Sequence, residues 1–558
     1  MTDTATEQAP EKKSLNERML GAIESVGNKV PHPVIMFLYL IAFIAVLSAI
    51  LAFFDVSVTE EIAEPVPRQE LADLRDALGG SIIAYDVFTG QEAIIPDYII
   101  KEETIPVRSL LSIDGLRFML SSIVTNVANF GVIAVILVAM AGVGVAEVSG
   151  LMASLIRKLV AVAPRQLIAF ILIFIGVLSS VATDAGYLIL IPLSATAFLT
   201  IGRHPLAGIA ASFAGVSAVF AVNILITPTD AMLTEITNAA IGLTGAESID
   251  ITANLFFGAV SSIVLAFVAV VITTRLIEPR LGPYDPSEGD PTWVSTDETV
   301  NEEAAAADSR GLRWATWGFL GTFAAIALLT LPPGAPLRDP STGDIIGTTP
   351  FMASLIFLIT MVFLVSGITY GFGAGTFSNR NQIVDAVTKT FAGLSGLIFM
   401  LVMIAQFIAF FNYSNMPRVA AVEMAGLLER SSISALPLLV GFILVIVVLN
   451  LIIPGVVPKW AIFAPVFIPI FVRLDVAPQT LLAAYRIGDG PTNVLTPLMV
   501  YLPFILIVAQ RYKKDAGLGT IVAMMLPYAL GILVAWVALF VVWFLLGIPL
   551  GPGAPVNL

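Results

Sequence analysis

The stretch that decides the fold is residues 166–203, QLIAFILIFIGVLSSVATDAGYLILIPLSATAFLTIGR. Its first apolar limb, residues 166–180, would be about 22 Å long as a helix, which is shorter than the roughly 30 Å hydrocarbon core of a bilayer. A polar break at 179–186 follows, and a second short limb ends at Arg203. Because Arg165 and Arg203 close both ends with positive charge, we predict a re-entrant hairpin with its tip at membrane depth.

A second copy of this pattern occurs later in the chain, at residues 435–473, where two apolar limbs flank the break 454–460. Five full spans are expected between corresponding hairpins, and this odd number turns the second copy upside down. Inverted repeats that carry discontinuous helices are typical of secondary transporters. One constant spacing of 273 positions relates Tyr187, Pro192, Pro205 and Gly215 to Trp460, Pro465, Pro478 and Gly488.

The composition indicates a chain that is mostly solvated by lipid. Of its 558 residues, 57% are hydrophobic and 12% are charged, against about 25% charged in an ordinary soluble domain. The chain has no cysteine and two histidines, which argues against disulfides, thiolate catalysis and histidine-rich metal sites. We therefore expect a lipid bilayer and a small-molecule substrate as partners, and no nucleic acid.

The predicted fold class is an all-α polytopic membrane protein, with nine transmembrane helices plus two re-entrant hairpins in an inverted repeat. Basic residues before the first span place the N-terminus in the cytoplasm of a bacterium, and the odd number of spans places the C-terminus in the periplasm, across the inner membrane. The expected segments are a cytoplasmic N-terminal segment 1–30, a first repeat 31–277 with periplasmic loop 55–116 and hairpin 166–203, a cytoplasmic linker 278–312, an additional span 313–331, a second repeat 332–547 with hairpin 435–473, and a periplasmic tail 548–558.

Charged residues inside the predicted membrane segments are the first candidates for a transport site, because charge in hydrocarbon is costly unless it is paired or hydrated. Asp184 lies in the first hairpin tip, Lys459 in the second, and Arg486 with Asp489 in the broken span that follows. The planar donors of Arg486 suit bidentate binding of a substrate carboxylate. The alternative is a structural salt bridge between Arg486 and Asp489, which are three residues apart.

Two hairpin-tip residues have both a functional and a structural interpretation. Asp184 is a candidate cation ligand or proton carrier, or else it caps the helical limb that starts at Ala185. Trp460, beside Lys459, is a candidate to stack on a planar substrate group, or else it packs in the core or at the membrane interface, as most membrane-protein tryptophans do.

Breaks in two spans supply candidate ligands for a coupling ion. The segment 488–493 combines helix-breaking Gly and Pro with Asp489, a threonine and Asn493, and a comparable break follows Asn223. Oxygen ligands of this kind suit Na⁺, although proline-kinked helices also occur without any ion. The coupling-ion candidates are Asp184, Asn223, Thr227, Asp230, Asp489, Asn493 and Thr496, and the choice between Na⁺ and H⁺ stays open.

Several motifs of this chain resemble those of the AbgT family of transporters, namely PKWAIFAP at 458–465, AYRIGD at 484–489 and DAGY at 184–187. The resemblance covers nearly the whole chain. It implies a dimer of bowl-shaped protomers with nine spans and two hairpins, and a role in uptake of p-aminobenzoyl-glutamate or export of sulfonamide antimetabolites. The family's functional positions map onto Asp184, Trp460, Pro478, Arg486 and Asp489. One departure is Val457, where the family usually has a serine.

The sequence thus predicts an ion-gradient-driven secondary transporter of p-aminobenzoyl-glutamate-like anions, sulfonamides or both. No enzyme activity is expected, and no cofactor beyond possible Na⁺ or H⁺ coupling. A Na⁺-coupled dicarboxylate carrier is the alternative. An intramembrane hydrolase is disfavoured because the chain lacks cysteine and a central histidine, and a passive channel because paired hairpins form a site that can be closed. The direction of transport stays open.

Overall fold

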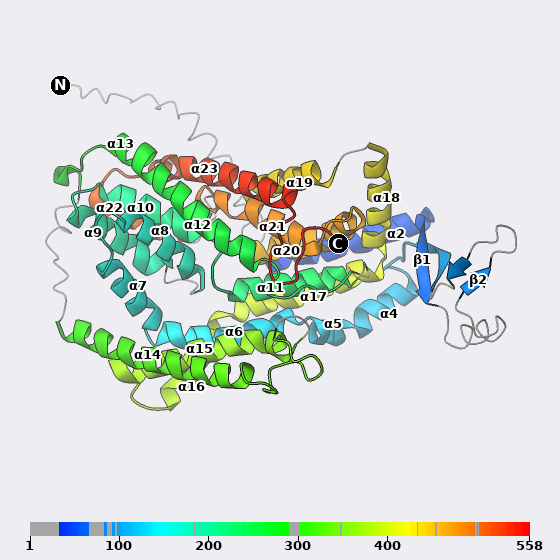
Figure 1. Cartoon of the computed structure of the whole chain (residues 1–558). Coiled ribbons are helices and arrows are strands. Elements are labelled where there is room, and N and C mark those ends of the chain that lie inside the picture. The colour runs from blue at the N-terminus through cyan, green and yellow to red at the C-terminus, as the bar shows by residue number, and fades with distance from the viewer. Residues whose placement is uncertain are drawn as a thin grey trace, which may run out of the picture.

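The computed structural model describes residues 33–65, 83–85, 92–94, 98–181, 186–242, 244, 246–289, 302–345, 349–431, 434–451, 455–496, 499 and 501–558, and these are mostly helical (Figure 1). Within these ranges, 7 helices are long and apolar enough to cross a membrane, or up to 8 if one bent pair counts as a span. The prediction of a multi-pass helical membrane protein is therefore confirmed. The seven are α2 (Pro33–Phe53), α12 (Leu255–Ile272), α14 (Glu302–Thr330), α15 (Pro350–Ala374), α17 (Ser395–Tyr413), α20 (Val456–Arg473) and α23 (Leu518–Leu545).

The predicted loop 55–116 contains β-strands, so the all-α prediction was wrong in this region. Strand β1 (Ser57–Pro65) pairs antiparallel with β4 (Tyr98–Pro106), and the short β2 (Ile83–Tyr85) pairs with β3 (Glu92–Ile94). They project from one end of the molecule (Figure 1). The acidic residues suggested only a solvated loop, but β-branched residues recur between them and favour extended backbone.

Four helices connect the strands β1 to β4 to the first predicted re-entrant hairpin. They are α4 (Ile113–Ser121), α5 (Ile123–Asn129), α6 (Val132–Val148) and α7 (Leu151–Ala161). The axes of α5 and α6 differ by 49°, so this span is bent. Gly150 between α6 and α7 has a φ of +91°, a left-handed conformation that glycine adopts without a steric penalty.

Both predicted hairpin ranges contain two helices with a break between them. In the first, α8 (Ile168–Leu178) and the 3₁₀ turn η1 (Ser179–Val181) precede the π-helical turn η2 (Gly186–Leu190) and α9 (Ile191–Thr200). In the second, α19 (Ala435–Asn450) precedes α20. Asp184, at the first break, lies outside the described residues.

Two further segments are broken helices, and their breaks meet. The first consists of α10 (Pro205–Phe213) with η3 (Ala214–Ala218), followed by α11 (Pro228–Ile241). The second consists of α21 (Pro478–Asp489) with η6 (Pro491–Val494), followed by α22 (Leu502–Tyr512). The break at Gly490 lies so close to η3 that an added Cβ would be 3.0 Å from the carbonyl oxygen of Ala218. Irregular backbone from both segments therefore lies together in the interior.

Each broken helix packs its backbone directly against the first limb of the preceding hairpin range. A Cβ at Gly215 would lie 2.4 Å from the carbonyl oxygen of Ile173 on α8. A Cβ at Gly488 would lie 2.6 Å from Cβ of Ile446 on α19. Gly215 and Gly488 are 273 positions apart, and so are Ile173 and Ile446. The spacing seen in the sequence therefore also relates contacts in three dimensions.

The remaining helices surround this centre. Helix α15 packs against α14 on one side and α6 on the other, α16 (Asn381–Gly393) also packs against α6, and α12 packs on α23 across the molecule (Figure 1). Helix α18 (Met416–Ser431) contacts α20. The C-terminal tail folds back, because the carbonyl oxygen of Val556 accepts hydrogen bonds from the amide of Ala477 (3.2 Å) and the hydroxyl of Thr480 (2.7 Å). The tail thereby holds the first turn of α21.

Candidate functional site

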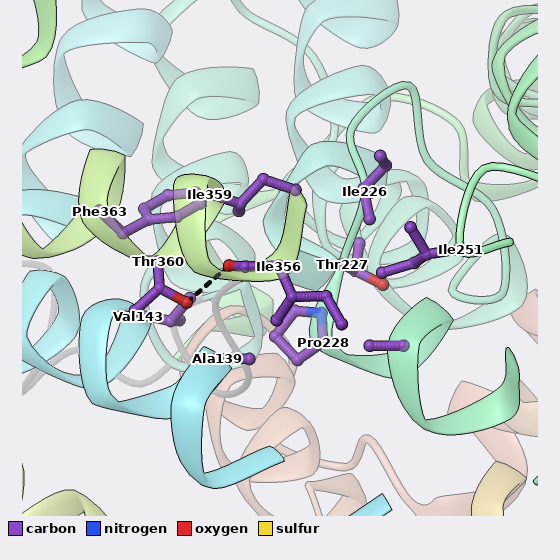
Figure 2. Close-up of a pocket in the computed structure, with 11 residues that line it drawn as sticks. Ala139, Val143, Ile226, Thr227, Pro228, Ile251, Ile356, Ile359, Thr360 and Phe363 are labelled. Carbon is purple, nitrogen blue, oxygen red and sulfur yellow. Dashed lines mark hydrogen bonds between the residues drawn. The ribbon is translucent and has the colours of Figure 1, made fainter. Parts of the chain in front are cut away.

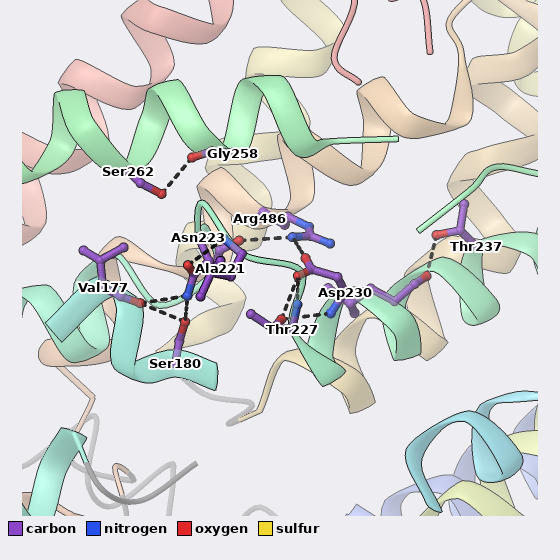
Figure 3. Close-up of polar contacts among 12 residues, drawn as sticks. Val177, Ser180, Ala221, Asn223, Thr227, Asp230, Thr237, Gly258, Ser262 and Arg486 are labelled. Atoms are coloured by element: carbon purple, nitrogen blue, oxygen red, sulfur yellow. Dashed lines mark hydrogen bonds and ion pairs between the residues drawn. The ribbon is translucent and has the colours of Figure 1, made fainter. Parts of the chain in front are cut away.

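Arg486 and Asp230 form an ion pair that joins the two broken helices. Nη1 of Arg486, on α21, contacts Oδ1 of Asp230, on α11, and also donates to the carbonyl oxygen of Ala221 at 3.2 Å (Figure 3). The side chains are 9% and 17% exposed. Arg486 therefore pairs across the molecule with Asp230, and not with Asp489 three residues away, which was the structural alternative drawn from the sequence.

Asp230 is held in place by a capping box at the start of α11. Its Oδ2 accepts hydrogen bonds from the backbone amide and the hydroxyl of Thr227, both at 2.7 Å, and the Thr227 hydroxyl accepts from the amide of Asp230 at 3.2 Å. Pro228 occupies the first turn, where its missing N–H costs nothing. One carboxylate oxygen of Asp230 thus fixes the helix end while the other faces Arg486.

Lys459 and Asp489 form a second ion pair, which is fully buried. Nζ of Lys459, on α20, lies 2.6 Å from Oδ1 of Asp489, and the side chains are 0% and 1% exposed. The ammonium also donates to Oδ1 of Asn450 at the end of α19. Such a pair is tolerated only when both charges are present, because either one alone would be buried without compensation.

Asn450 organises the polar groups around this pair. Its amide nitrogen contacts the carbonyl oxygen of Asp489, Oγ1 of Thr492 at 2.9 Å and Oδ1 of Asn493 at 2.9 Å. An amide has two N–H donors, so these three acceptors share them. Asn450 was not predicted from the sequence, and Thr492 belonged to the predicted ligand segment 488–493 without being chosen as a coupling-ion candidate. A lone asparagine at the end of an otherwise apolar limb was the signal available for Asn450.

Asn223 and Thr496 both reach the end of a hairpin limb. The amide of Asn223 donates to the carbonyl oxygens of Val177 (3.1 Å) and Leu178 (3.4 Å), and the hydroxyl of Thr496 donates to that of Leu451 (3.3 Å). These carbonyls lie at helix C-termini, where the helix itself offers no donor. Asn223 and Thr496 are 273 positions apart, as are Leu178 and Leu451, so the repeat spacing also relates these two contacts.

Trp460 is packed inside the protein in this structure. The indole is fully buried, its Nε1–H donates to Oγ1 of Thr237 at 2.9 Å, and its ring centroid is 4.6 Å from that of Tyr485. Tyr485 thus occupies part of the surface that was predicted to stack on a substrate. Pro478 is buried at the first turn of α21, where proline's fixed φ favours helix initiation.

Comparison with known proteins places the chain in a family. The model described as "AbgT putative transporter family" matches residues 18–558. The chain belongs to the AbgT family of transporters. It is 32% identical over 541 residues to the "p-aminobenzoyl-glutamate transport protein" of Escherichia coli K12, covering 97% of each chain.

Two solved AbgT structures have the same fold. The YdaH transporter of Alcanivorax borkumensis superposes with a TM-score of 0.80 and 35% identity, over 94% of this chain and 100% of YdaH. MtrF of Neisseria gonorrhoeae, whose structure illuminates a class of antimetabolite efflux pumps, gives a TM-score of 0.81 and 36% identity, over 96% of this chain and 100% of MtrF.

The turn η2 in the first hairpin range of this AbgT protein lies against the second broken helix. Residues 182–185, including Asp184, are outside the described part of the chain. Immediately after them, the ring of Tyr187 stacks on that of Tyr501, with centroids 4.3 Å apart and planes 11° apart. The π-helical turn η2, which carries Tyr187, is thereby held close to the start of α22.

Two narrow cavities lie near the ion pair of Arg486 and Asp230. One, shown in Figure 2, lies beside Thr227 and Pro228 and has a volume of about 20 Å³. Its other walls are Thr360 and apolar side chains, most of them from α6 and α15. Another is lined by Arg486, Asn254 and Trp536 and has a volume of about 10 Å³. A cavity volume of about 10 to 15 Å³ admits about one water molecule. The packing around Arg486 is therefore tight in this conformation.

Proposed function

We propose that this AbgT transporter is an ion-gradient-driven carrier of p-aminobenzoyl-glutamate-like anions, sulfonamides or both. The observation that carries the proposal is the pair of buried cation–carboxylate contacts, Arg486 with Asp230 and Lys459 with Asp489, where two broken helices cross. Ionisable groups buried at a membrane interior are typical of substrate and ion pathways. The substrates named for the E. coli and N. gonorrhoeae relatives support the choice of ligand class.

The proposed architecture has nine spans and two re-entrant hairpins in an inverted repeat, with α8–α9 and α19–α20 as the hairpins. Helix α20 has the length and hydropathy of a span, but in this proposal it is the second limb of a hairpin and does not cross the bilayer. Helix α8 has 11 residues, about 16 Å, which is too short to cross a bilayer. The contacts repeated at 273 positions support two copies of one unit, 31–277 and 332–547. We further propose a homodimer in the bacterial inner membrane, with the N-terminus cytoplasmic and the C-terminus periplasmic.

In this proposal Arg486 binds the substrate carboxylate. Its guanidinium presents several donors in one plane, and Asp230 engages the Nη1 end. Trp460 contributes to binding the aromatic ring, which requires the ring of Tyr485 to move aside. Opening of the tight packing around Arg486 is then part of the transport cycle, as alternating access requires.

Coupling is proposed to act at the second pair. A proton or Na⁺ that binds Asp489 competes with the ammonium of Lys459 for the same carboxylate. The side-chain oxygen of Asn450 accepts from Lys459, and the amide nitrogen of Asn450 donates to oxygens of Thr492 and Asn493, so oxygen atoms of the kind that hard cations prefer adjoin this ion pair. Asp184 is proposed as a second coupling residue from the first hairpin tip.

The same amide and hydroxyl cluster favours the second candidate, a Na⁺-coupled dicarboxylate carrier. Such a carrier also needs an arginine for the anion, but it has no use for an aromatic ring. Competition by succinate together with indifference to p-aminobenzoate analogues identifies this alternative.

The test is counterflow of radiolabelled p-aminobenzoyl-glutamate in proteoliposomes, with Na⁺ and pH gradients imposed separately. Wild type is compared with Arg486→Ala and with Arg157→Ala, which removes a half-exposed arginine paired with Asp308 on the outer helices. We expect gradient-driven flux in wild type and Arg157→Ala and its loss in Arg486→Ala. Normal flux in Arg486→Ala, or no flux of p-aminobenzoyl-glutamate and of sulfonamides in wild type, would overturn the proposal.

A further inference from the structure

Asn254 is a half-buried residue whose side-chain oxygen and nitrogen are buried and make no hydrogen bond among the described residues. It precedes α12 at the position where an asparagine usually caps a helix, yet its side chain makes no capping hydrogen bond. The reason is that the carbonyl oxygen of Leu550, from the C-terminal tail, already accepts from the amides of Phe256 (2.9 Å) and Phe257 (3.1 Å). The amide of Asn254 is therefore free for another role.

Both polar atoms of the Asn254 side chain are buried without a hydrogen-bond partner among the described residues. Nε of Arg486 is in the same condition, on a residue that is 8% exposed. Buried polar groups in proteins are almost always paired, so an orphaned amide beside an orphaned guanidinium N–H calls for an explanation. Both side chains line the same narrow cavity, which Gly258 and Trp536 also border.

The chemistry of this cavity favours an anionic oxygen. Arg486 uses its Nη1 for Asp230 and Ala221, and this leaves the edge that carries Nε turned to other partners. Asn254 adds two N–H donors, and every other residue that lines the cavity has an apolar side chain or, in Trp536, an indole N–H that already donates to Ser261 at 3.1 Å. The open volume is that of about one water-sized atom, which matches a single carboxylate oxygen.

We propose that Asn254 is a substrate-binding residue, and that its amide and Nε of Arg486 form a subsite for one carboxylate oxygen of the transported anion. This rests on the proposed function of Arg486 and adds to it a second residue and a defined edge of the guanidinium. The carboxylate then binds Arg486 on the side away from Nη1, so Asp230 stays in contact with the arginine when the anion binds.

The test compares an anionic ligand with its neutral ester on full-length protein in proteoliposomes. Inhibition of p-aminobenzoyl-glutamate counterflow is measured with unlabelled p-aminobenzoyl-glutamate and with its dimethyl ester. The variants are Asn254→Leu, which removes the donors at similar volume, and Asn254→Asp, which keeps the shape and repels a carboxylate. Ser262→Ala is the control. The Ser262 hydroxyl lies two turns from the start of α12 and donates to the carbonyl oxygen of Gly258.

Asn254→Leu is expected to weaken inhibition by the anion about tenfold or more, since a hydrogen bond to a charged group is lost, while inhibition by the ester changes less than about twofold. Asn254→Asp is expected to weaken inhibition by the anion further. Ser262→Ala is expected to leave inhibition by both ligands unchanged. If Asn254→Leu weakens inhibition by the anion and by the ester equally, or leaves inhibition by the anion unchanged, the proposed role of Asn254 is overturned. If wild type carries succinate in place of p-aminobenzoyl-glutamate, the proposed substrate fails, and the same comparison with succinate and its dimethyl ester decides the role of Asn254.

Discussion

The contributions of Lys459 and Asp489 to the free energy of unfolding should depend strongly on each other. Lys459→Met leaves the Asp489 carboxylate at 1% exposure without its cation, and we expect this to cost about 3 to 5 kcal/mol of unfolding free energy. Asp489→Asn strands the ammonium of Lys459 at 0% exposure and should cost a similar amount. The double variant removes both charges and should cost far less than the sum, which gives a coupling energy of at least about 3 kcal/mol.

The assay is a denaturant titration of the purified protein in mixed micelles, read by tryptophan fluorescence, for the two single variants and the double variant. Lys513→Met is the matched control, because Lys513 pairs with Glu288 at 3.2 Å with both side chains a third or more exposed. It should cost less than about 1 kcal/mol. If the double variant of Lys459 and Asp489 costs the sum of the single ones, the two charges do not stabilise each other and the reasoning is refuted.

Three further predictions concern packing, pH and a buried hydrogen bond. Gly488→Ala should destabilise the protein by about 1 to 3 kcal/mol because its Cβ would meet Ile446, whereas Gly441→Ala, with nothing within 4 Å, should not; equal Tm values would contradict this. Burial lowers the pKa of His204, outweighing the opposite effect of Glu288, so the neutral form is favoured on folding. Its contribution to stability should be present above about pH 6.5 and lost as the pH falls through the lowered pKa, and a pH titration of His204→Asn, which can still cap α10, should lack this loss. Thr237→Val should cost about 1 to 3 kcal/mol because it leaves the buried indole N–H of Trp460 without its acceptor, and a denaturant titration in which adding Trp460→Phe recovers none of this cost would argue against the bond.

The helix breaks could be predicted from the sequence because they are local. A glycine, proline or polar cluster inside an apolar run interrupts a helix wherever the run folds, and the breaks after Leu178, Asn450 and Asp489 follow this rule. The strands β1 and β4 could not be predicted this way. Their pairing joins residues about 40 positions apart, and the acidic composition of the loop concealed it.

The partners of the charged residues could not be predicted either, because paired residues that are far apart in the sequence leave no local pattern. The spacing of Arg486 and Asp489 places them on one helical face, and a salt bridge between them was the structural alternative to substrate binding. In the fold each pairs with a residue from another helix, Asp230 and Lys459. Asp230 had been chosen as an ion ligand from its place in a Thr-Pro-Thr-Asp break, and that same motif builds the capping box that aims its second oxygen at Arg486.

The charge balance of the two pairs bears on how an anion can be carried. Arg486 and Lys459 are each matched by one carboxylate, so these four groups sum to zero charge. An anion that binds Arg486 while Asp230 stays in place adds a negative charge to a site with little water, where uncompensated charge is costly. A proton or Na⁺ that arrives with the anion restores the balance, and Asp489 and Asp230 are carboxylates that can take it. Under the proposed mechanism, anion binding should therefore tighten as the pH falls or as Na⁺ rises, and affinity that depends on neither would separate substrate binding from ion coupling.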